Sequence, residues 1–301
     1  MGAGHHHPSG HAGTHHRWRL ATTFGLVAAF LVVELVVGLS TGSLALVSDA
    51  GHMAADVVAL GAALAATKIA TRPDTTGRRT YGSYRAEIFA SGLTVLIMLG
   101  VAAYVVVEAL GRWGDDVEVS PGPLLVVGTL GLAVNVVSML LLRGGSDESL
   151  NVKGAYYEVV ADAAGSVGVI VAGLLVRVTG DGWWDTVVAL AIGVFVAVRA
   201  VALGREVLAV LGQHVPAGME VDDVVRDLEL VEGVADVHDL HVWTLTSGML
   251  VATAHLVLDE SGDAQQVLDG ARRVLRERHR VEHATLQVET TRTRECEDTT
   301  W

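Results

Sequence analysis

The chain has 301 residues, of which 51% are hydrophobic, and its mean hydropathy of +0.45 is high for a soluble protein. A formal net charge of −13 argues against a nucleic-acid partner, because phosphate backbones select basic surfaces. The single cysteine, Cys296, excludes a framework of intrachain disulfides.

The two ends of the chain have compositions that are typical of tails. Residues 1–17 are rich in histidine and glycine, which predicts a disordered segment whose histidines can bind metal loosely. Residues 291–301 form a short C-terminal tail. Cys296 lies there between two glutamates, as a candidate metal ligand or a bystander thiol.

Six apolar segments follow the N-terminal tail. Each is long enough to cross the roughly 30 Å hydrocarbon core of a bilayer, which takes about 20 helical residues. They are rich in valine, leucine, alanine and glycine, as membrane helices tolerate. The segments cover residues 20–39, 45–67, 87–110, 122–142, 155–176 and 185–203. We therefore predict an all-α six-helix transmembrane domain over residues 18–212.

Positive charges in the short loops predict the orientation of these helices. Arg17 and Arg19 precede the first segment, and lysines and arginines fill the loop between the second and third. The loops on the opposite side hold only Arg112 and Arg177. Because cytoplasmic loops carry the excess of positive charge, we expect a multi-pass protein of the cell (cytoplasmic) membrane with both termini in the cytoplasm.

From residue 213 onward the composition is that of a soluble, acidic domain. We assign helices to residues 220–231 and 263–280, and strands to residues 236–246, 249–258 and 284–289. The Ser-Gly pair at 247–248 supplies a hairpin turn between the first two strands. The order αββαβ predicts a cytoplasmic α/β domain over residues 213–290, with both helices on one face of a three-stranded sheet.

Two matched pairs of ligand-type side chains lie in the apolar segments. His52 and Asp56 are four residues apart in the second segment, so both point from one helical face. Glu158 and Asp162 repeat this spacing in the fifth segment. Charged groups at membrane depth usually mark an ion or proton path, and four donors suit a tetrahedral divalent ion. The four residues therefore predict an intramembrane metal site.

Other polar residues in these segments have weaker support. Asp49, one turn earlier on the same face, is a candidate for the access path of the ion. Asn135 and Ser138 are expected to hydrogen-bond between helices, which is the commoner role of such groups. We expect Glu34 and Glu108 nearer the membrane interfaces or paired with loop arginines.

Several motifs, in chain order, resemble the cation diffusion facilitator family of divalent-metal/proton exchangers. They are SLALVSDAGHMAAD, YGSYRAEIFASG, LNVKGAYYEVVADAAGSVG, VHDLHVW and HLVL. The resemblance covers nearly the whole chain after residue 17. It implies a cytoplasmic domain like that of a metallochaperone, and a homodimer that exports zinc, cobalt or cadmium across the lipid bilayer in exchange for protons. It implies neither enzyme activity nor an organic cofactor.

The resemblance also implies a cytoplasmic metal site, at which bound Zn2+ regulates transport. By family position its ligands are His238, His255 and Glu289. His241 and His283 are candidates for a second or dimer-bridging site. Because His238 and His241 are three residues apart, a regular strand points them to opposite faces unless it bulges. A glutamine, Gln287, stands where some relatives have a histidine.

Glu158 departs from the family pattern, since zinc exporters usually carry histidine or aspartate there. One imidazole and three carboxylates move the preference toward harder ions such as manganese, although His52 keeps a ligand that suits zinc. A manganese- or iron-preferring member of the family is therefore an alternative. Because metal affinity falls as ligands take up protons, we predict that His52 and either Glu158 or Asp162 carry the exchanged protons.

Two other functional classes remain open. An intramembrane metallohydrolase would place histidine and aspartate in membrane helices, but it needs a metal-bound water and a general base, and the sequence has no HExxH motif. A membrane-anchored metal sensor would use the soluble domain without needing four matched intramembrane groups. The paired spacing favours transport over both.

Overall fold

The structure is a computed structural model that describes residues 17–70, 80–112, 118–143, 150–246, 248–260 and 262–291. The histidine-rich segment 1–16 and Cys296 lie outside the described residues. The chain divides into two compact units. The helical unit comprises residues 1–64 and 90–204, and the α/β unit comprises residues 65–89 and 205–301. Each unit has a hydrophobic core of its own.

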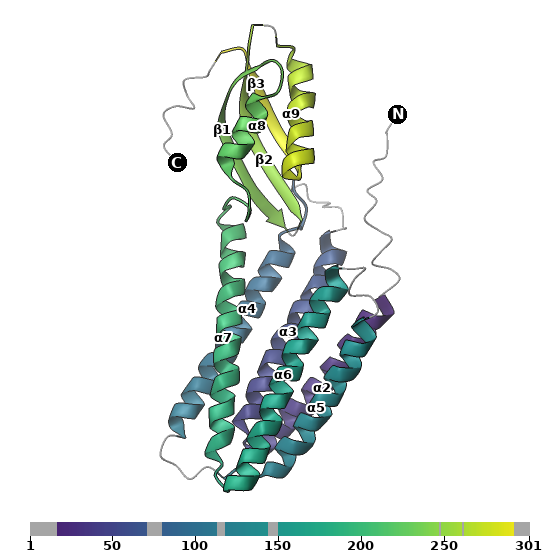
Figure 1. The fold of residues 1–301 in the computed structure, drawn as a ribbon, viewed down its shortest axis with the longest axis vertical. Coiled ribbons are helices and arrows are strands. Elements are labelled where there is room, and N and C mark those ends of the chain that lie inside the picture. Colours follow the sequence, from purple (N-terminus) through teal and green to yellow (C-terminus); the bar gives the residue numbers. More distant parts are fainter. Residues whose placement is uncertain are drawn as a thin grey trace. The chain divides into compact units, whose positions relative to one another are not determined.

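Six long helices lie in the described part of the chain before residue 212 (Figure 1). They are α2 (Arg17–Thr41), α3 (Leu44–Ala70), α4 (Ala86–Gly111), α5 (Pro121–Arg143), α6 (Leu150–Thr179) and α7 (Trp183–Leu211). Five of them are long and apolar enough to cross a membrane by the composition of their described residues. The predicted helical membrane domain is confirmed.

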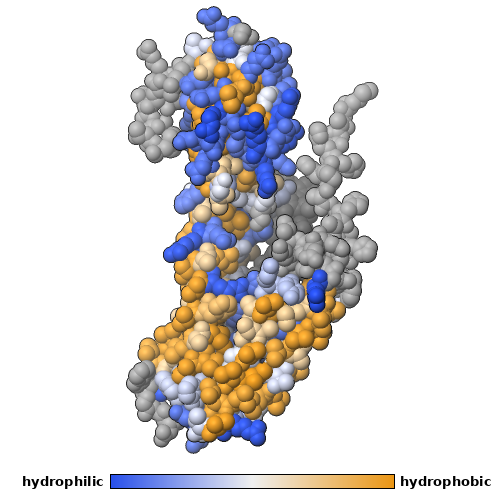
Figure 2. Space-filling view, in the orientation of Figure 1, coloured by the Kyte–Doolittle hydropathy of each residue, from blue (hydrophilic) through white to orange (hydrophobic). Residues whose placement is uncertain are grey.

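The outer surface of the helical unit is apolar (Figure 2). Large aliphatic side chains point outward from several helices, among them Val107 of α4 with 69% of its surface exposed and Val126 of α5 with 68%. In water such a surface would aggregate, whereas lipid chains solvate it. The chain is therefore a multi-pass membrane protein.

Close packing of α5 against α6 depends on glycine. A Cβ atom at Gly131 of α5 would lie 2.9 Å from Ser166 Oγ of α6, and one at Gly128 would lie 2.9 Å from Ile170 of α6. Small residues let membrane helices approach, and polar side chains then bond across the gap. Asn135 of α5 donates to Ser166 Oγ of α6 at 3.3 Å, which is the interhelical bond expected from the sequence.

The start of α3 is fixed by Asp185 of α7, which is fully buried. Its carboxylate accepts hydrogen bonds from Ser43 Oγ at 2.6 Å and from the backbone N–H groups of Leu44 at 2.6 Å and Ala45 at 3.3 Å. These N–H groups have no partner within the helix, so the carboxylate caps them. The Arg112 guanidinium lies 3.6 Å from the same carboxylate. Asp185 therefore sets the position of the helix that carries His52.

Replacing Asp185 by alanine should destabilise the helical unit. The change leaves three buried donors and Arg112 without their acceptor, at a cost of about 3 kcal/mol, or on the order of 10 °C in the midpoint of thermal unfolding. Unfolding of the purified protein in detergent measures this. Glu108→Gln is the matched control, because Glu108 meets Arg112 at 3.5 Å but is 43% exposed, so its loss should change little. Equal midpoints for the two variants would contradict the anchoring role.

The α/β unit holds two helices and three strands in the predicted order (Figure 1). They are α8 (Val221–Glu229), β1 (Val234–Thr246), β2 (Met249–Leu258), α9 (Ala264–His279) and β3 (Val281–Glu289). Strand β2 lies in the middle of the sheet, antiparallel to β1 and parallel to β3. Val224 and Leu228 of α8 and Leu275 of α9 are fully buried in the core that the two helices form with the sheet. The predicted αββαβ fold is confirmed.

A polar contact joins the two helices of this unit. Asp227 of α8 accepts from Arg278 of α9 at 2.6 Å and lies 2.9 Å from His279 Nε2. Desolvation acts to raise the pKa of Asp227, but the hydrogen bonds and charges of His279 and Arg278 outweigh it and lower that pKa below its ordinary value. The same contact holds α8 beside α9 over the sheet.

Candidate metal sites

His52, Asp56 and Asp162 converge in the helical unit. His52 Nε2 lies 3.7 Å from Asp56 Oδ2 and 3.6 Å from Asp162 Oδ1. One ligand atom from each residue lies within 4.8 Å of the other two. His52 and Asp162 are buried, and the i, i+4 spacing on α3 places His52 and Asp56 on one face. Three donors with this spacing can surround one divalent cation and leave a coordination position open.

Glu158, the fourth residue of the predicted site, lies beside this cluster and not within it. Its carboxylate accepts a hydrogen bond from Arg199 Nη2 of α7 at 2.5 Å, and its side chain is 45% exposed. The other terminal nitrogen of the same guanidinium, Nη1, lies 3.0 Å from His52 Nε2. Arg199 therefore connects Glu158 to the three-residue cluster.

Arg199 was not among the residues predicted for this site. The signal was nevertheless present, because residue 199 lies inside the sixth apolar segment, 185–203. An arginine at such a position is rarely neutral to function, since a charge in a membrane helix needs a partner.

Two more acids are buried in the helical unit. Glu34 of α2 and Asp49 of α3 interact with each other, yet no donor reaches any of their four carboxylate oxygens among the described atoms. Glu34 is buried in the helical unit, with 1% of its surface exposed, and no described arginine reaches its carboxylate. A Cβ at Gly165 of α6 would collide with Asp49 Oδ1, so glycine makes room for this carboxylate. Two facing carboxylates without a donor can be stabilised by a shared proton.

A second cluster lies in the α/β unit, with one residue from each strand. His238 of β1 and His255 of β2 are cross-strand partners, and Glu289 ends β3. Glu289 Oε2 lies 3.3 Å from His238 Nε2, and its Oε1 lies 3.0 Å from His255 Nδ1. Ligand atoms of the three residues lie within 4.8 Å of one another. Two imidazoles and a carboxylate are a donor set that suits zinc.

Strand β1 bulges immediately after His238. The pairing register shifts between His238 and His241, and Asp239 adopts the left-handed conformation with φ of 53°. Asp239 thereby reaches His241 Nε2 at 3.0 Å and His255 Nε2 at 3.8 Å. The bulge allows His238 and His241 to lie on the same side of the strand, as the sequence analysis required for a shared site. His241, however, is linked to the cluster through Asp239, which the sequence did not point to.

Two further residues that the sequence analysis named lie outside this cluster of three, and the role of His283 at a second or dimer-bridging site stays a prediction. His283 of β3 pairs with Val251 and contacts the Tyr81 ring, with ring centres 5.7 Å apart. Gln287 lies opposite His255 and donates a hydrogen bond to Glu289 Oε1 at 2.8 Å. Gln287 thus orients a carboxylate of the cluster instead of supplying a ligand.

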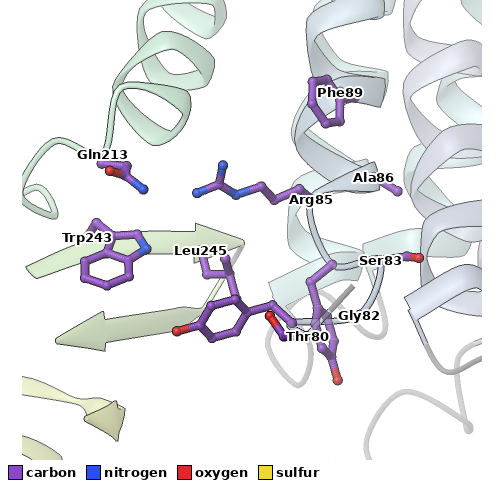
Figure 3. A pocket seen from close by; sticks show the side chains of 11 residues that line it. Thr80, Gly82, Ser83, Arg85, Ala86, Phe89, Gln213, Trp243 and Leu245 are labelled. Carbon is purple, nitrogen blue, oxygen red and sulfur yellow. The ribbon is translucent and has the colours of Figure 1, made fainter. Parts of the chain in front are cut away.

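The α/β unit also contains a cavity of about 590 Å³, lined by the segment Thr80–Ala86 with Phe89, Gln213, Trp243 and Leu245. Figure 3 shows Arg85 extending toward Gln213 and Trp243. Its lining residues include no histidine, cysteine or carboxylate, so this cavity is not a third metal site.

Comparison with known proteins matches both units. Residues 20–211 match the cation efflux transmembrane domain, and residues 216–291 match the cytoplasmic domain of cation efflux proteins. The chain is 41% identical over 290 residues to the metal cation efflux system protein CzcD of Cupriavidus metallidurans, which covers 96% of this chain and 90% of that protein.

Two further relatives are similar over most of their length. The zinc transporter ZitB of Escherichia coli is 33% identical, over 96% of this chain and 93% of that protein. The cadmium, cobalt and zinc/H(+)-K(+) antiporter of Bacillus subtilis is 31% identical, over 90% of this chain and 88% of that protein. The solved metal-bound C-terminal domain of the CzcD transporter matches 24% of this chain and 99% of that chain at 32% identity, with a TM-score of 0.23.

Removing a ligand from the α/β unit should abolish zinc binding there. In full-length protein whose intramembrane cluster is disabled by Asp162→Ala, we expect Glu289→Ala to eliminate zinc binding measured by calorimetry. Gln287→Leu should weaken it by about 10- to 100-fold, because the carboxylate loses the group that orients it. His283→Ala is the control and should leave the affinity unchanged. Weakened binding in His283→Ala, or unchanged binding in Glu289→Ala, would contradict this ligand set.

Proposed function

This chain belongs to the cation efflux family, and from that premise we propose that it exports divalent metal ions, with zinc first among them, in exchange for protons. The observation that carries the proposal is the convergence of His52, Asp56 and Asp162 inside a unit of membrane-spanning helices. Family membership makes the chain a transporter and not an enzyme, so the metallohydrolase alternative is set aside.

The donor chemistry supports zinc as the substrate. With Glu158 bound to Arg199, the three residues that face one another are one imidazole and two carboxylates, which suit a borderline cation better than three carboxylates would. The relatives are named for zinc, cadmium and cobalt, which supports the same group of ions. A preference for manganese or iron would be expected if Glu158 were a third carboxylate ligand of the ion.

Exchange with protons follows from competition for the same atoms. A metal ion needs the lone pair of His52 Nε2 and the negative charges of Asp56 and Asp162, and protons bind at these same places. His52, the one imidazole of the cluster, is therefore the first candidate to take up a proton when the ion leaves. One of the acids on α6, Asp162 or Glu158, takes up the second exchanged proton.

The setting of this exchange also belongs to the proposal. The arginines of the loops support a location in the cell membrane with both termini in the cytoplasm. The match to the cytoplasmic domain of cation efflux proteins supports a homodimer. Zinc bound by His238, His255 and Glu289 would then couple the cytosolic zinc level to transport.

Zinc uptake into proteoliposomes with an imposed pH gradient tests the function. The native protein should accumulate zinc on the side that supplies protons. Asp162→Ala should reduce the rate on the order of 100-fold, because a cluster of three ligands loses one of its two carboxylates. Glu108→Gln, which alters an acid of α4 outside the cluster, should retain the native rate.

Three outcomes would contradict the proposal. A native protein that binds zinc but moves none would favour the membrane-anchored sensor. An Asp162→Ala variant with native flux would remove the intramembrane cluster from the transport path. A His52→Ala variant that keeps full dependence on the pH gradient would show that the imidazole carries no exchanged proton.

A further inference from the structure

We propose that Arg199 is a tethered competitor of the transported ion: its guanidinium covers His52 when neither an ion nor an exchanged proton is bound there, and the incoming ion must displace it. In this account Glu158 is not a ligand of the ion but the anion to which the guanidinium stays bound when it leaves His52. The inference rests on the proposed function, since it concerns how the same intramembrane cluster takes up and releases its substrate.

The contact on His52 involves the atom that the ion needs. Arg199 Nη1 lies 3.0 Å from His52 Nε2, and this nitrogen is also the one that faces Asp56 at 3.7 Å and Asp162 at 3.6 Å. A guanidinium can only donate hydrogen bonds, so His52 Nε2 accepts here and is the unprotonated nitrogen of the ring. The lone pair that would bind the ion is therefore already occupied by a cationic donor.

The second contact gives the guanidinium a partner that it keeps when it leaves His52. Arg199 Nη2 donates to Glu158 Oε2 at 2.5 Å, so one planar group bridges α3 and α6 from α7. Phe195, one turn earlier on α7, lies under the guanidinium at 5.9 Å and meets the His52 ring edge-on at 6.0 Å. The Arg199 side chain is 29% exposed, so it can withdraw from His52 without entering the packed core.

The charges of the site support the same assignment. Asp56, Asp162 and Glu158 contribute three negative charges when ionised, and Arg199 contributes one positive charge. The sum is the charge that a single divalent cation neutralises. Without Arg199, the ion-bound site would keep an uncompensated negative charge among membrane helices, which is unfavourable. Arg199 thus neutralises the charge of Glu158, and the divalent ion neutralises the charges of the two aspartates.

A tethered competitor makes opposite predictions for the two members of one ion pair. Arg199→Gln removes the competitor, so the KM for zinc should fall by about tenfold, and kcat should fall as well because release becomes slow. Glu158→Gln removes the carboxylate that holds the guanidinium when it withdraws from His52 and also removes a negative charge, so the KM should rise by about tenfold. The double variant should lie between the two single variants.

Zinc uptake into proteoliposomes gives KM and kcat, and zinc binding to the full-length protein in detergent gives the affinity. Both use Glu289→Ala protein, which removes the cytoplasmic cluster from the binding signal. A purely structural ion pair would shift both single variants in the same direction, and that result, or no shift in either, would overturn the proposal. Opposite shifts in zinc affinity would support it even if the native protein moved no zinc, in which case the proposed function alone would fail.

Arg199→Lys keeps the test decisive should the glutamine variant fail to fold. Lysine preserves the positive charge beside Glu158, but a single ammonium lacks the planar fork that contacts two groups at once. His52 is then released, and the zinc KM should fall in the same direction as in Arg199→Gln, by a smaller factor. A KM that rises in the lysine variant would overturn the proposal.

Discussion

Ionisable side chains are stable among membrane helices only where their charges are compensated, and this constraint governs the helical unit. His52, Asp56 and Asp162 lie close enough to share one cation, and no basic residue among the described ones neutralises both aspartates directly. Either a metal ion or protons must therefore compensate the cluster. Exchange of one for the other follows from this requirement, because the two kinds of cation bind at the same atoms.

The rest of the unit positions these groups. Asp185 caps α3 and fixes the depth of His52, while glycines at the α5–α6 contact and at Gly165 leave room for close packing and for the Asp49 carboxylate. Arg199 brings a fixed positive charge to the edge of the cluster. The α/β unit applies similar chemistry in water, where the bulge at Asp239 lets neighbouring strands gather histidines and acids around Glu289.

Much of this arrangement is predictable from the sequence, because it depends on period and composition. Apolar length predicts the membrane helices, and the spacing of four places His52 and Asp56 on one face. Pairwise contacts between helices are not encoded in that way. Glu158 has the spacing of a ligand, but whether it meets the ion or Arg199 depends on how α7 packs against α6, which periodicity does not specify. The role of Asp239 likewise depends on a bulge, which the VHDLHVW motif permits without requiring.

The central claim is that zinc binds within the membrane to one imidazole and to aspartate oxygens. Zinc K-edge X-ray absorption on full-length Glu289→Ala protein tests it most directly, because the method counts imidazole ligands. The account predicts a single imidazole nitrogen at about 2.0 Å, with oxygen atoms completing the shell, and loss of the imidazole signal in the additional variant His52→Ala. A spectrum without imidazole, or one that His52→Ala leaves unchanged, would contradict it.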